Sequence, residues 1–249
     1  MKLYINGDSH SCGAETYGGY TFAKDDPNYA HLSDLAHPKC LELSWGYLLA
    51  RTLNAGFFCD AVSASSNDRI LRRTYDYIKK DANNFILIGW STWEREEWLV
   101  DGTYYQVSGG GKDTVPNECQ DRYKQWVIDQ TQDAINEKMR IWHGKIWDLH
   151  VELQERNIQH LFFNAWSWFD TRYLIEKDWS NCYLDPYSKT GTYWQWCADN
   201  GFKTVNPDSF HYGVDAQKAW AKYLLPRLTN TQNNSNIVRV ATNIYKSDR

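Results

Sequence analysis

The sequence predicts an α/β domain whose central sheet is mostly parallel and is covered by helices on both faces. Two continuous apolar runs, residues 84–89 and 160–166, have the length and composition of strands buried on both faces of such a sheet. A shorter apolar run at residues 2–5 precedes them, and helical patterns separate the runs. Strands that alternate with helices are typical of a parallel sheet, because parallel neighbours need a crossover connection.

The predicted elements begin with the strand at residues 2–5, which a Gly-Asp-Ser turn follows, and with a loop rich in Gly, Asp, His and Pro at residues 12–39. Leu and Trp then repeat at helical spacing from Leu41 to Leu53, and Asn54-Ala55-Gly56 ends this helix as a glycine C-cap does. The remaining elements are, in order, a strand at 57–62, a helix at 69–80, the strand at 84–89, one long helix or two stacked helices at 118–156, the strand at 160–166, and a last helix that contains 216–224 and is ended by Pro226.

We expect residues 1–228 to form a single domain with insertions at about 91–117 and 167–205. The first insertion has an irregular pattern, in which Glu94 to Glu97 are most simply a solvated helix start. The second insertion is rich in aromatic residues, and its secondary structure is not predictable from the pattern. Residues 229–249 are polar and are expected to form a tail or an edge strand.

The composition excludes several classes of protein. The 249 residues carry a formal net charge of −4 without a basic stripe, which argues against a nucleic-acid surface. No apolar stretch is long enough to span a bilayer, and the start lacks a signal-peptide pattern, so we expect a cytoplasmic protein without a membrane partner. The oligomeric state is not predictable.

The sequence predicts no metal and no cofactor. The six cysteines are scattered without a Cys-x-x-Cys pair, so they are expected to be reduced structural thiols. His143 and His150 lie seven residues apart on the predicted long helix and could share a face, but a solvated or structural role is favoured.

Two polar turns carry the pattern of a serine nucleophile with its base. Ser9 lies in the turn after the first strand, at the carboxyl edge of the sheet, where ligands bind in open α/β sheets. A serine hydroxyl needs a histidine to accept its proton and a carboxylate to orient that histidine. Asp208 and His211, just before the last helix, offer both groups. The sequence therefore predicts that the two ends of the chain meet.

These turns resemble the SGNH (GDSL-type) serine hydrolases. Gly7-Asp8-Ser9 matches the nucleophile block of that family, and Asp208-x-x-His211 matches its last block. The resemblance implies a three-layer, flavodoxin-like fold in which Ser9 is the nucleophile, His211 the general base and Asp208 the orienting carboxylate. It covers most of the chain outside the insertions.

The two middle blocks of the family pattern differ in this chain. The resemblance places Ala64, or its neighbour Ser65, where the family has a glycine whose N–H stabilises the oxyanion together with the N–H of Ser9. The family's Gly-x-Asn-Asp block is replaced by Gly89-Trp90-Ser91-Thr92, which lacks the amide donor. Loss of one such donor costs about 10²–10³ in rate. Asn67, or the hydroxyls of Ser91 and Thr92, could take its place.

A narrower resemblance concerns SGNH-like proteins of tailed phages of marine bacteria. It rests on the runs Ser66-Asn67-Asp68-Arg69-Ile70 and Gly89-Trp90-Ser91-Thr92-x-x-Arg95. This resemblance implies a host-cytoplasmic or virion location. Within the second run, Arg95 could reach an anionic group of a substrate.

Four tryptophans follow the ends of predicted strands and could stack on a sugar or an acyl group: Trp90, Trp93, Trp166 and Trp168. Core packing is the competing explanation for all four. Together the features predict a serine esterase that acts on a small-molecule or glycan ester, with an O-acetylated carbohydrate as the favoured substrate. Two alternatives stay open, namely a glycan-binding or virion-associated module that has lost turnover, and a hydrolase of thioesters or lipids.

Overall fold

A four-stranded parallel sheet forms the centre of the protein, whose computed structural model describes residues 1–21, 36–81, 83–110 and 115–228. The order is β2-β1-β3-β6, with bounds β1 Lys2–Asn6, β2 Gly56–Cys59, β3 Phe85–Trp90 and β6 His160–Asn164. The central pairs align Ile5 with Leu87, and Leu87 with Leu161. The prediction of an α/β fold with a parallel central sheet is confirmed.

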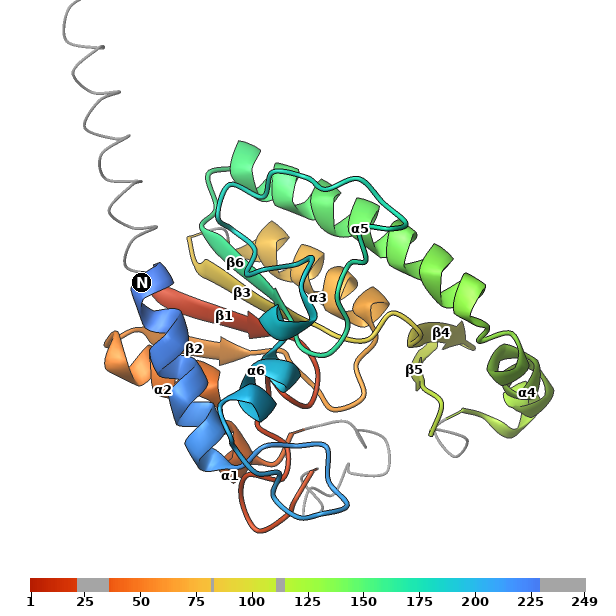
Figure 1. The fold of residues 1–249 in the computed structure, drawn as a ribbon, viewed down its shortest axis with the longest axis horizontal. Coiled ribbons are helices and arrows are strands. Elements are labelled where there is room, and N and C mark those ends of the chain that lie inside the picture. Colours follow the sequence, from red (N-terminus) through yellow and green to blue (C-terminus); the bar gives the residue numbers. More distant parts are fainter. Residues whose placement is uncertain (22–35, 82, 111–114, 229–249) are drawn as a thin grey trace, which may run out of the picture.

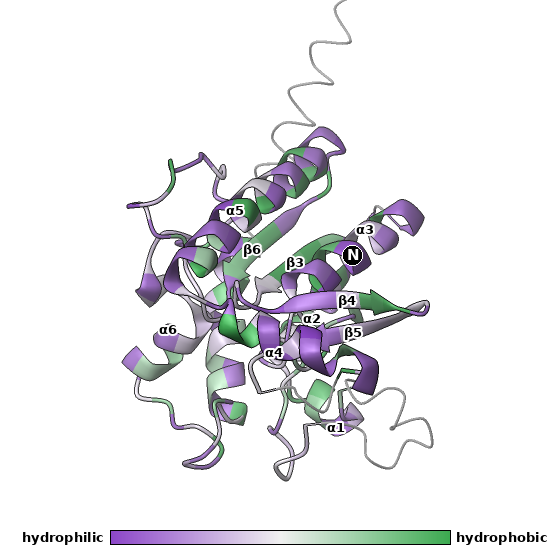
Figure 2. Cartoon of the chain, turned by 90° about the vertical axis from the view of Figure 1, so that its right-hand side faces the viewer, coloured by the Kyte–Doolittle hydropathy of each residue, from purple (hydrophilic) through white to green (hydrophobic). Residues whose placement is uncertain are grey.

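Helices cover both faces of this sheet, as Figure 1 shows. One face carries α2 (Trp45–Thr52), α6 (Tyr193–Asp199) and a last helix at residues 214–228. The other face carries α3 (Asn67–Lys80) and α5 (Gln132–Glu155). Side chains on a strand alternate between faces, so Leu3 and Ile5 pack on the first group of helices, while Tyr4 packs on the second. Figure 2 shows the resulting hydrophobic colour along the central strands.

The remaining helices are short and lie outside these two layers: α1 (Pro38–Leu41), the 3-10 helix η2 (Asn117–Cys119), α4 (Gln120–Ile128) and the 3-10 helix η3 (Lys189–Gly191). The helix predicted from Leu41 to Leu53 is thus divided, because Ser44 caps α2 by accepting a hydrogen bond from the N–H of Tyr47. The last helix continues past Pro226 to residue 228, since Leu228 extends its buried face.

The first insertion contains a β-hairpin, which corrects the expectation of an irregular segment with a solvated helix start. Strands β4 (Glu96–Val100) and β5 (Thr103–Val107) pair antiparallel around Asp101-Gly102, both of which have positive φ. Glu97 accepts two hydrogen bonds of 2.7 Å from the Arg72 guanidinium, so this glutamate joins the hairpin to α3. The hairpin and α4 lie beyond the carboxyl ends of the strands (Figure 1).

The second insertion runs as a loop before η3 and α6, and a short part of it lies along β6. There the N–H of Phe162 donates to the carbonyl of Cys182, and the N–H of Leu184 donates to that of Phe162. The predicted tail or edge strand at 229–249 lies outside the described residues. Within the described ranges, no helix is both long and apolar enough to cross a bilayer.

Candidate active site

The turn after β1 is fixed by its own backbone and by a glycine. The N–H groups of Ser11 and Cys12 donate to the carbonyl of Asp8, and the N–H of Ala14 donates to that of Ser9. Gly7 has a φ of 150°, and a Cβ there would lie 2.8 Å from the carbonyl oxygen of Gly89. Only glycine fits at position 7 without strain. The turn thus holds Ser9, which is 6% exposed, at the carboxyl edge of the sheet.

The Asp8 carboxylate is buried and contacts polar and charged side chains instead of solvent. Its Oδ2 accepts a 2.8 Å hydrogen bond from the Ser91 hydroxyl and lies 3.5 Å from Arg95 Nη1, while Arg95 also donates to Ser91 Oγ at 2.9 Å. Its Oδ1 accepts a hydrogen bond from the N–H of His10. A buried carboxylate needs such partners, so Ser91 and Arg95 tie the end of β3 to the serine turn.

His211 lies beside this turn, and its carboxylate neighbour is Glu15. Nδ1 of His211 is 3.1 Å from Oε2 of Glu15, and the ring centroids of His211 and His10 are 5.3 Å apart. Ser209 donates its hydroxyl to the same Glu15 oxygen and accepts a hydrogen bond from the N–H of His211. Nothing in the sequence pattern marked Glu15, whose φ of 65° is unusual for a residue other than glycine.

Asp208 lies in the same segment but is exposed. Its N–H donates to the side-chain oxygen of Asn206, and its carboxylate forms no hydrogen bond or ion pair with the described residues. The structure therefore brings Ser9 and His211 into one region with Glu15, while Asp208 faces outward.

Gln217 joins the two ends of the chain. Its amide nitrogen donates to the carbonyl of His10 at 3.4 Å and to the Tyr193 hydroxyl at 3.0 Å, and its oxygen accepts from the N–H of Trp45 at 2.8 Å. Gln217 is 2% exposed on the buried face of the last helix. A polar residue on an apolar helix face is the signal by which the sequence could have marked it.

His10 is the second histidine of the region and is a weak base. Burial lowers its pKa to about 4, and the positive charge of Arg95 acts in the same direction against the opposing effect of Asp8. Its ring lies 5.4 Å from that of Tyr193 and 6.1 Å from that of Trp166. His10 is thus neutral at pH 7, and its ring lines the candidate site.

The backbone N–H groups of Ser9 and Ala64 form no hydrogen bond with any described residue, and the buried Thr92 hydroxyl also has no partner there, whereas the other oxyanion candidates are occupied. Ala64 has a φ of 62°, which an alanine adopts only at a cost. The N–H of Ser65 donates to the carbonyl of Val62. Asn67 holds the backbone of residues 91–92 through three hydrogen bonds of 2.8 to 3.3 Å.

The four strand-end tryptophans divide into core and surface. Trp90 is 0% exposed and Trp93 is 3% exposed, and both pack in the cluster under α5. They present no face to a substrate, which corrects the expectation for these two residues. Trp166 and Trp168 are half-buried, and Trp166 lies 4.5 Å from the ring of Trp194.

Phe210 completes an aromatic rim that the sequence did not indicate. It is 67% exposed, and its ring meets that of Trp166 edge-on at 5.9 Å. Because Phe210 precedes His211, this rim borders the histidine.

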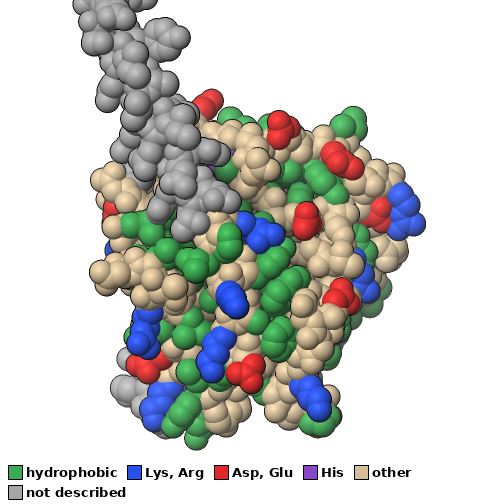
Figure 3. All heavy atoms as spheres, turned by 60° about the vertical axis from the view of Figure 1, so that its left-hand side comes forward, with side chains coloured by type: hydrophobic (Ala, Val, Ile, Leu, Met, Phe, Trp, Pro, Cys, Tyr) green, Lys and Arg blue, Asp and Glu red, His purple; other side chains and the backbone are tan. Residues whose placement is uncertain are grey.

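A surface groove of about 460 Å3 lies elsewhere, between α2 and the last helix. Figure 3 shows this side of the molecule, where hydrophobic side chains lie among lysines and arginines. None of the candidate catalytic residues lines this groove.

A family model described as a family of unknown function (DUF6071) matches residues 29–201, which is well over half of the chain. The chain belongs to this family. The DUF6071 match includes Ala64, Asn67 and Ser91 but begins after Ser9 and ends before His211. It therefore gives no information about the serine turn or its histidine.

Several solved structures are distantly similar to this DUF6071 chain. They include a carbohydrate esterase described as having divergent catalytic and non-catalytic binding functions (TM-score 0.44, 14% identity, 92% of this chain) and an acetyl xylan esterase from the rumen bacterium Butyrivibrio proteoclasticus (TM-score 0.41, 13% identity, 93% of this chain). The chain spans 64% of the length of each of these two. TesA is similar over 93% of this chain and 99% of its own, with a TM-score of 0.44 and 10% identity. No curated protein sequence matches the chain.

Proposed function

We propose that the protein is a serine hydrolase of acyl esters, with Ser9 as nucleophile and His211 as general base. The observation that carries this proposal is the position of His211, whose Nδ1 lies 3.1 Å from the Glu15 carboxylate beside the turn of Ser9. Nδ1 is close to this carboxylate but not aligned for a hydrogen bond, so the proposal requires a small rotation of the ring or of Glu15. A histidine then held by the carboxylate keeps its proton on Nδ1, and the lone pair on Nε2 is available to a hydroxyl. His10 does not compete as a base, because burial lowers its pKa to about 4.

The reaction follows from these groups. Ser9 Oγ attacks the acyl carbonyl as its proton passes to Nε2 of His211, and the oxyanion accepts hydrogen bonds from the N–H groups of Ser9 and Ala64. The tetrahedral intermediate then expels the alcohol, which takes the proton from His211. Water repeats the sequence on the acyl-enzyme and releases the carboxylic acid and free Ser9.

Glu15 is our first assignment for the orienting carboxylate, and Asp208 is the second. Glu15 is supported by its contact with Nδ1 and by the Ser209 hydroxyl that holds the same oxygen. Asp208 is supported by the sequence resemblance alone and would need the 208–211 turn to rotate.

The favoured substrate class is an O-acylated carbohydrate. Its support is the aromatic rim next to His211, made of the exposed Phe210 and the half-buried Trp166 and Trp194, because sugar rings stack on aromatic faces. Trp168, half-buried below Lys189, is a further candidate contact.

A second candidate function is glycan binding without turnover. The observation that favours it is the engagement of Asn67 and Ser91, which leaves the oxyanion without a side-chain amide. One lost donor costs about 10²–10³ in rate.

The test is hydrolysis of p-nitrophenyl acetate together with covalent labelling by a fluorophosphonate. We expect both in the wild type, neither in Ser9→Ala, and both in Ser11→Ala, a control in the same turn whose hydroxyl is buried and unpaired. A folded wild type that neither turns over nor labels contradicts the hydrolase proposal. Binding to acetylated and deacetylated xylan fragments then tests the second candidate.

A further inference from the structure

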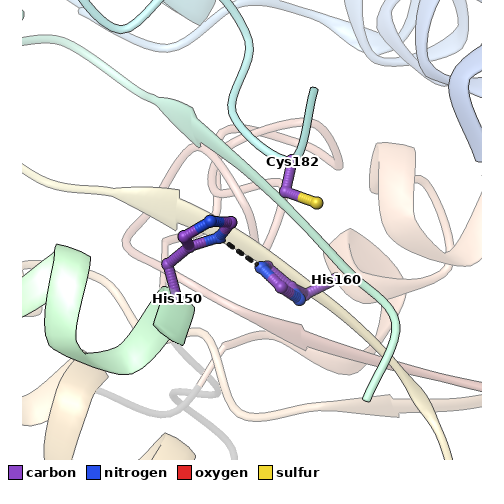
Figure 4. A group of neighbouring side chains, drawn as sticks. All are labelled: His150, His160 and Cys182. Carbon is purple, nitrogen blue, oxygen red and sulfur yellow. Dashed lines mark hydrogen bonds between the residues drawn. The ribbon is translucent and has the colours of Figure 1, made fainter. Parts of the chain in front are cut away.

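Three side chains that bind soft metals meet at the other end of the sheet. Among the described residues, His150, His160 and Cys182 form a group whose ligand atoms all lie within 4.8 Å of one another (Figure 4). His150 is 0% exposed and His160 is 2% exposed, while Cys182 is half-buried. The group is separate from the serine turn, because His160 begins β6 whereas Ser9 follows the carboxyl end of β1.

The fold brings these residues together from three segments. His150 lies near the C-terminal end of α5, which runs antiparallel to the strands and leads into β6. Cys182 lies in the second insertion, where its carbonyl accepts a 2.8 Å hydrogen bond from the N–H of Phe162 in β6. One ligand thus comes from the helix layer, one from the sheet and one from the insertion.

The hydrogen bonds of the pair define which nitrogens carry protons. Nδ1 of His160 lies 3.0 Å from the carbonyl of Ile158, which can only accept, so Nδ1 carries the proton and Nε2 has a lone pair. Nδ1 of His150, 2.8 Å from that Nε2, must then be the donor. Nε2 of His150 is left as a buried lone pair without a partner among the described residues.

This donor set suits a metal ion. Histidine ligands of zinc usually donate their other ring N–H to a carbonyl or carboxylate, as His160 does to Ile158. Two neutral imidazoles and a thiol are nitrogen and sulfur donors of the kind that select Zn²⁺ over hard cations. Tetrahedral Zn²⁺ sets its donors roughly 3.3–3.7 Å apart. The ligand atoms now lie within 4.8 Å of one another, and the two imidazoles share a 2.8 Å hydrogen bond, so the side chains must shift and this hydrogen bond must open to admit the ion.

We propose that His150, His160 and Cys182 form a Zn²⁺ site that fastens the second insertion to α5 and β6. Each histidine binds through Nε2, the nitrogen without a proton, so His150 keeps its Nδ1 proton and the hydrogen bond that it donates to His160 breaks. The Cys182 thiol releases its proton to solvent and binds as thiolate. A water molecule takes the fourth position, which the half-exposed side of Cys182 leaves accessible.

The site gives the insertion a role that is independent of the proposed hydrolase. Residues 165–188 carry Trp166 of the rim near one end and Cys182 near the other. A metal at Cys182 therefore limits the motion of the loop that supports the rim.

The test uses the full-length chain after removal of metal by a chelator, with Co²⁺ as the probe. We expect about one Co²⁺ per chain, with a thiolate-to-cobalt charge-transfer band and the visible bands of tetrahedral Co²⁺, and displacement of both by Zn²⁺. Cys182→Ser should lose the charge-transfer band, whereas Cys59→Ser, a control at another half-buried cysteine, should keep it.

Two further measurements distinguish loss of metal binding from loss of folding. Far-UV circular dichroism of metal-free Cys182→Ser should match the wild type, because Cys182 is half-exposed. Zn²⁺ should raise the melting temperature of the wild type and not of this variant. A wild type that binds no Co²⁺, or a Cys182→Ser protein with the same spectrum and shift as the wild type, overturns the proposal. The hydrolase assay is unaffected by either result.

Discussion

Two pairs of histidines lie at opposite ends of the parallel sheet, and they differ in the charges around them. At the carboxyl end, His10 and His211 lie beside Asp8 and Glu15, with Arg95 close by. At the amino end, His150 and His160 contact each other and have a thiol, Cys182, as their neighbour.

The difference follows from what each end of the sheet can hold. At the carboxyl end, several loops leave the strands together, so their backbone donors and hydroxyls can fix carboxylates next to an imidazole. Such an imidazole can accept and return a proton. The amino-end pair is buried among aromatic rings such as Trp179, where a charged imidazole is costly but a neutral one with a free lone pair is stable.

The strongest test of the carboxyl end is Glu15→Gln, set against Asp208→Asn. If Glu15 orients His211, Glu15→Gln lowers kcat by up to ~10⁴-fold, because the imidazole loses the acceptor that fixes its tautomer. Asp208→Asn is expected to change kcat by less than about twofold. Steady-state hydrolysis of p-nitrophenyl acetate by the two variants measures both effects. A larger loss of kcat in Asp208→Asn than in Glu15→Gln would assign the orienting role to Asp208.

The second test separates core from rim. Trp93→Ala should lower the free energy of unfolding by about 3–5 kcal/mol, because the Trp93 ring is buried against Phe169. Trp166→Ala should leave stability nearly unchanged and raise KM for an acetylated sugar by about 2- to 10-fold. Urea unfolding measures the change in stability, and steady-state kinetics measure the change in KM. Equal loss of stability in both variants would show that Trp166 is a core residue.

The third test concerns the network of Asp8. Ser91→Ala removes the hydroxyl that donates to the buried carboxylate, so we expect a loss of about 1–3 kcal/mol in unfolding free energy. Thr92→Val is the matched control, because the Thr92 hydroxyl is buried without a partner. Equal losses in the two variants would mean that the network does not hold the turn.

The last test concerns the acid sensitivity of His143, near the amino-end pair. The Tyr187 hydroxyl accepts from the N–H of Lys177 and from Trp179 Nε1, so its own proton goes to His143 Nε2. Burial lowers the pKa of His143 to about 4. Between pH 6.5 and 4 the unfolded chain binds a proton that the folded chain does not, so stability falls as the pH falls.

The measurement is urea unfolding of the wild type and His143→Gln across this pH range. The slope of unfolding free energy against pH should be shallower for His143→Gln than for the wild type, by about 1.4 kcal/mol per pH unit. Identical slopes would mean that folding does not lower the pKa of His143.

Local patterns were sufficient to predict the sheet, whereas contacts between distant segments were not predictable. The run at 84–89 forms β3 because every side chain there is buried, which leaves a simple apolar signal. The hairpin of β4 and β5 was also predictable, because Asp-Gly, here Asp101-Gly102, is a typical hairpin turn; the segment was nevertheless expected to be irregular. Ser9 and His211 were marked by their turns.

Other parts of the two sites had no signal of their own. Glu15 reaches His211 from a turn with positive φ in a glycine-rich segment, and side-chain direction there depends on the whole loop. His150, His160 and Cys182 are 10 and 22 residues apart, which matches no metal-binding motif. They meet only because α5, β6 and the second insertion pack together.

The hydrogen bond from Gln217 to the carbonyl of His10 has a consequence for synthesis of the protein. The two residues are separated by 207 positions in the chain, which a ribosome translates in roughly 10–40 s. During this interval the serine turn has left the ribosome without the helix that holds it and without His211. We therefore expect ribosome-bound chains that stop short of the last helix to be unreactive toward a fluorophosphonate, and reactivity to begin only when that helix has docked.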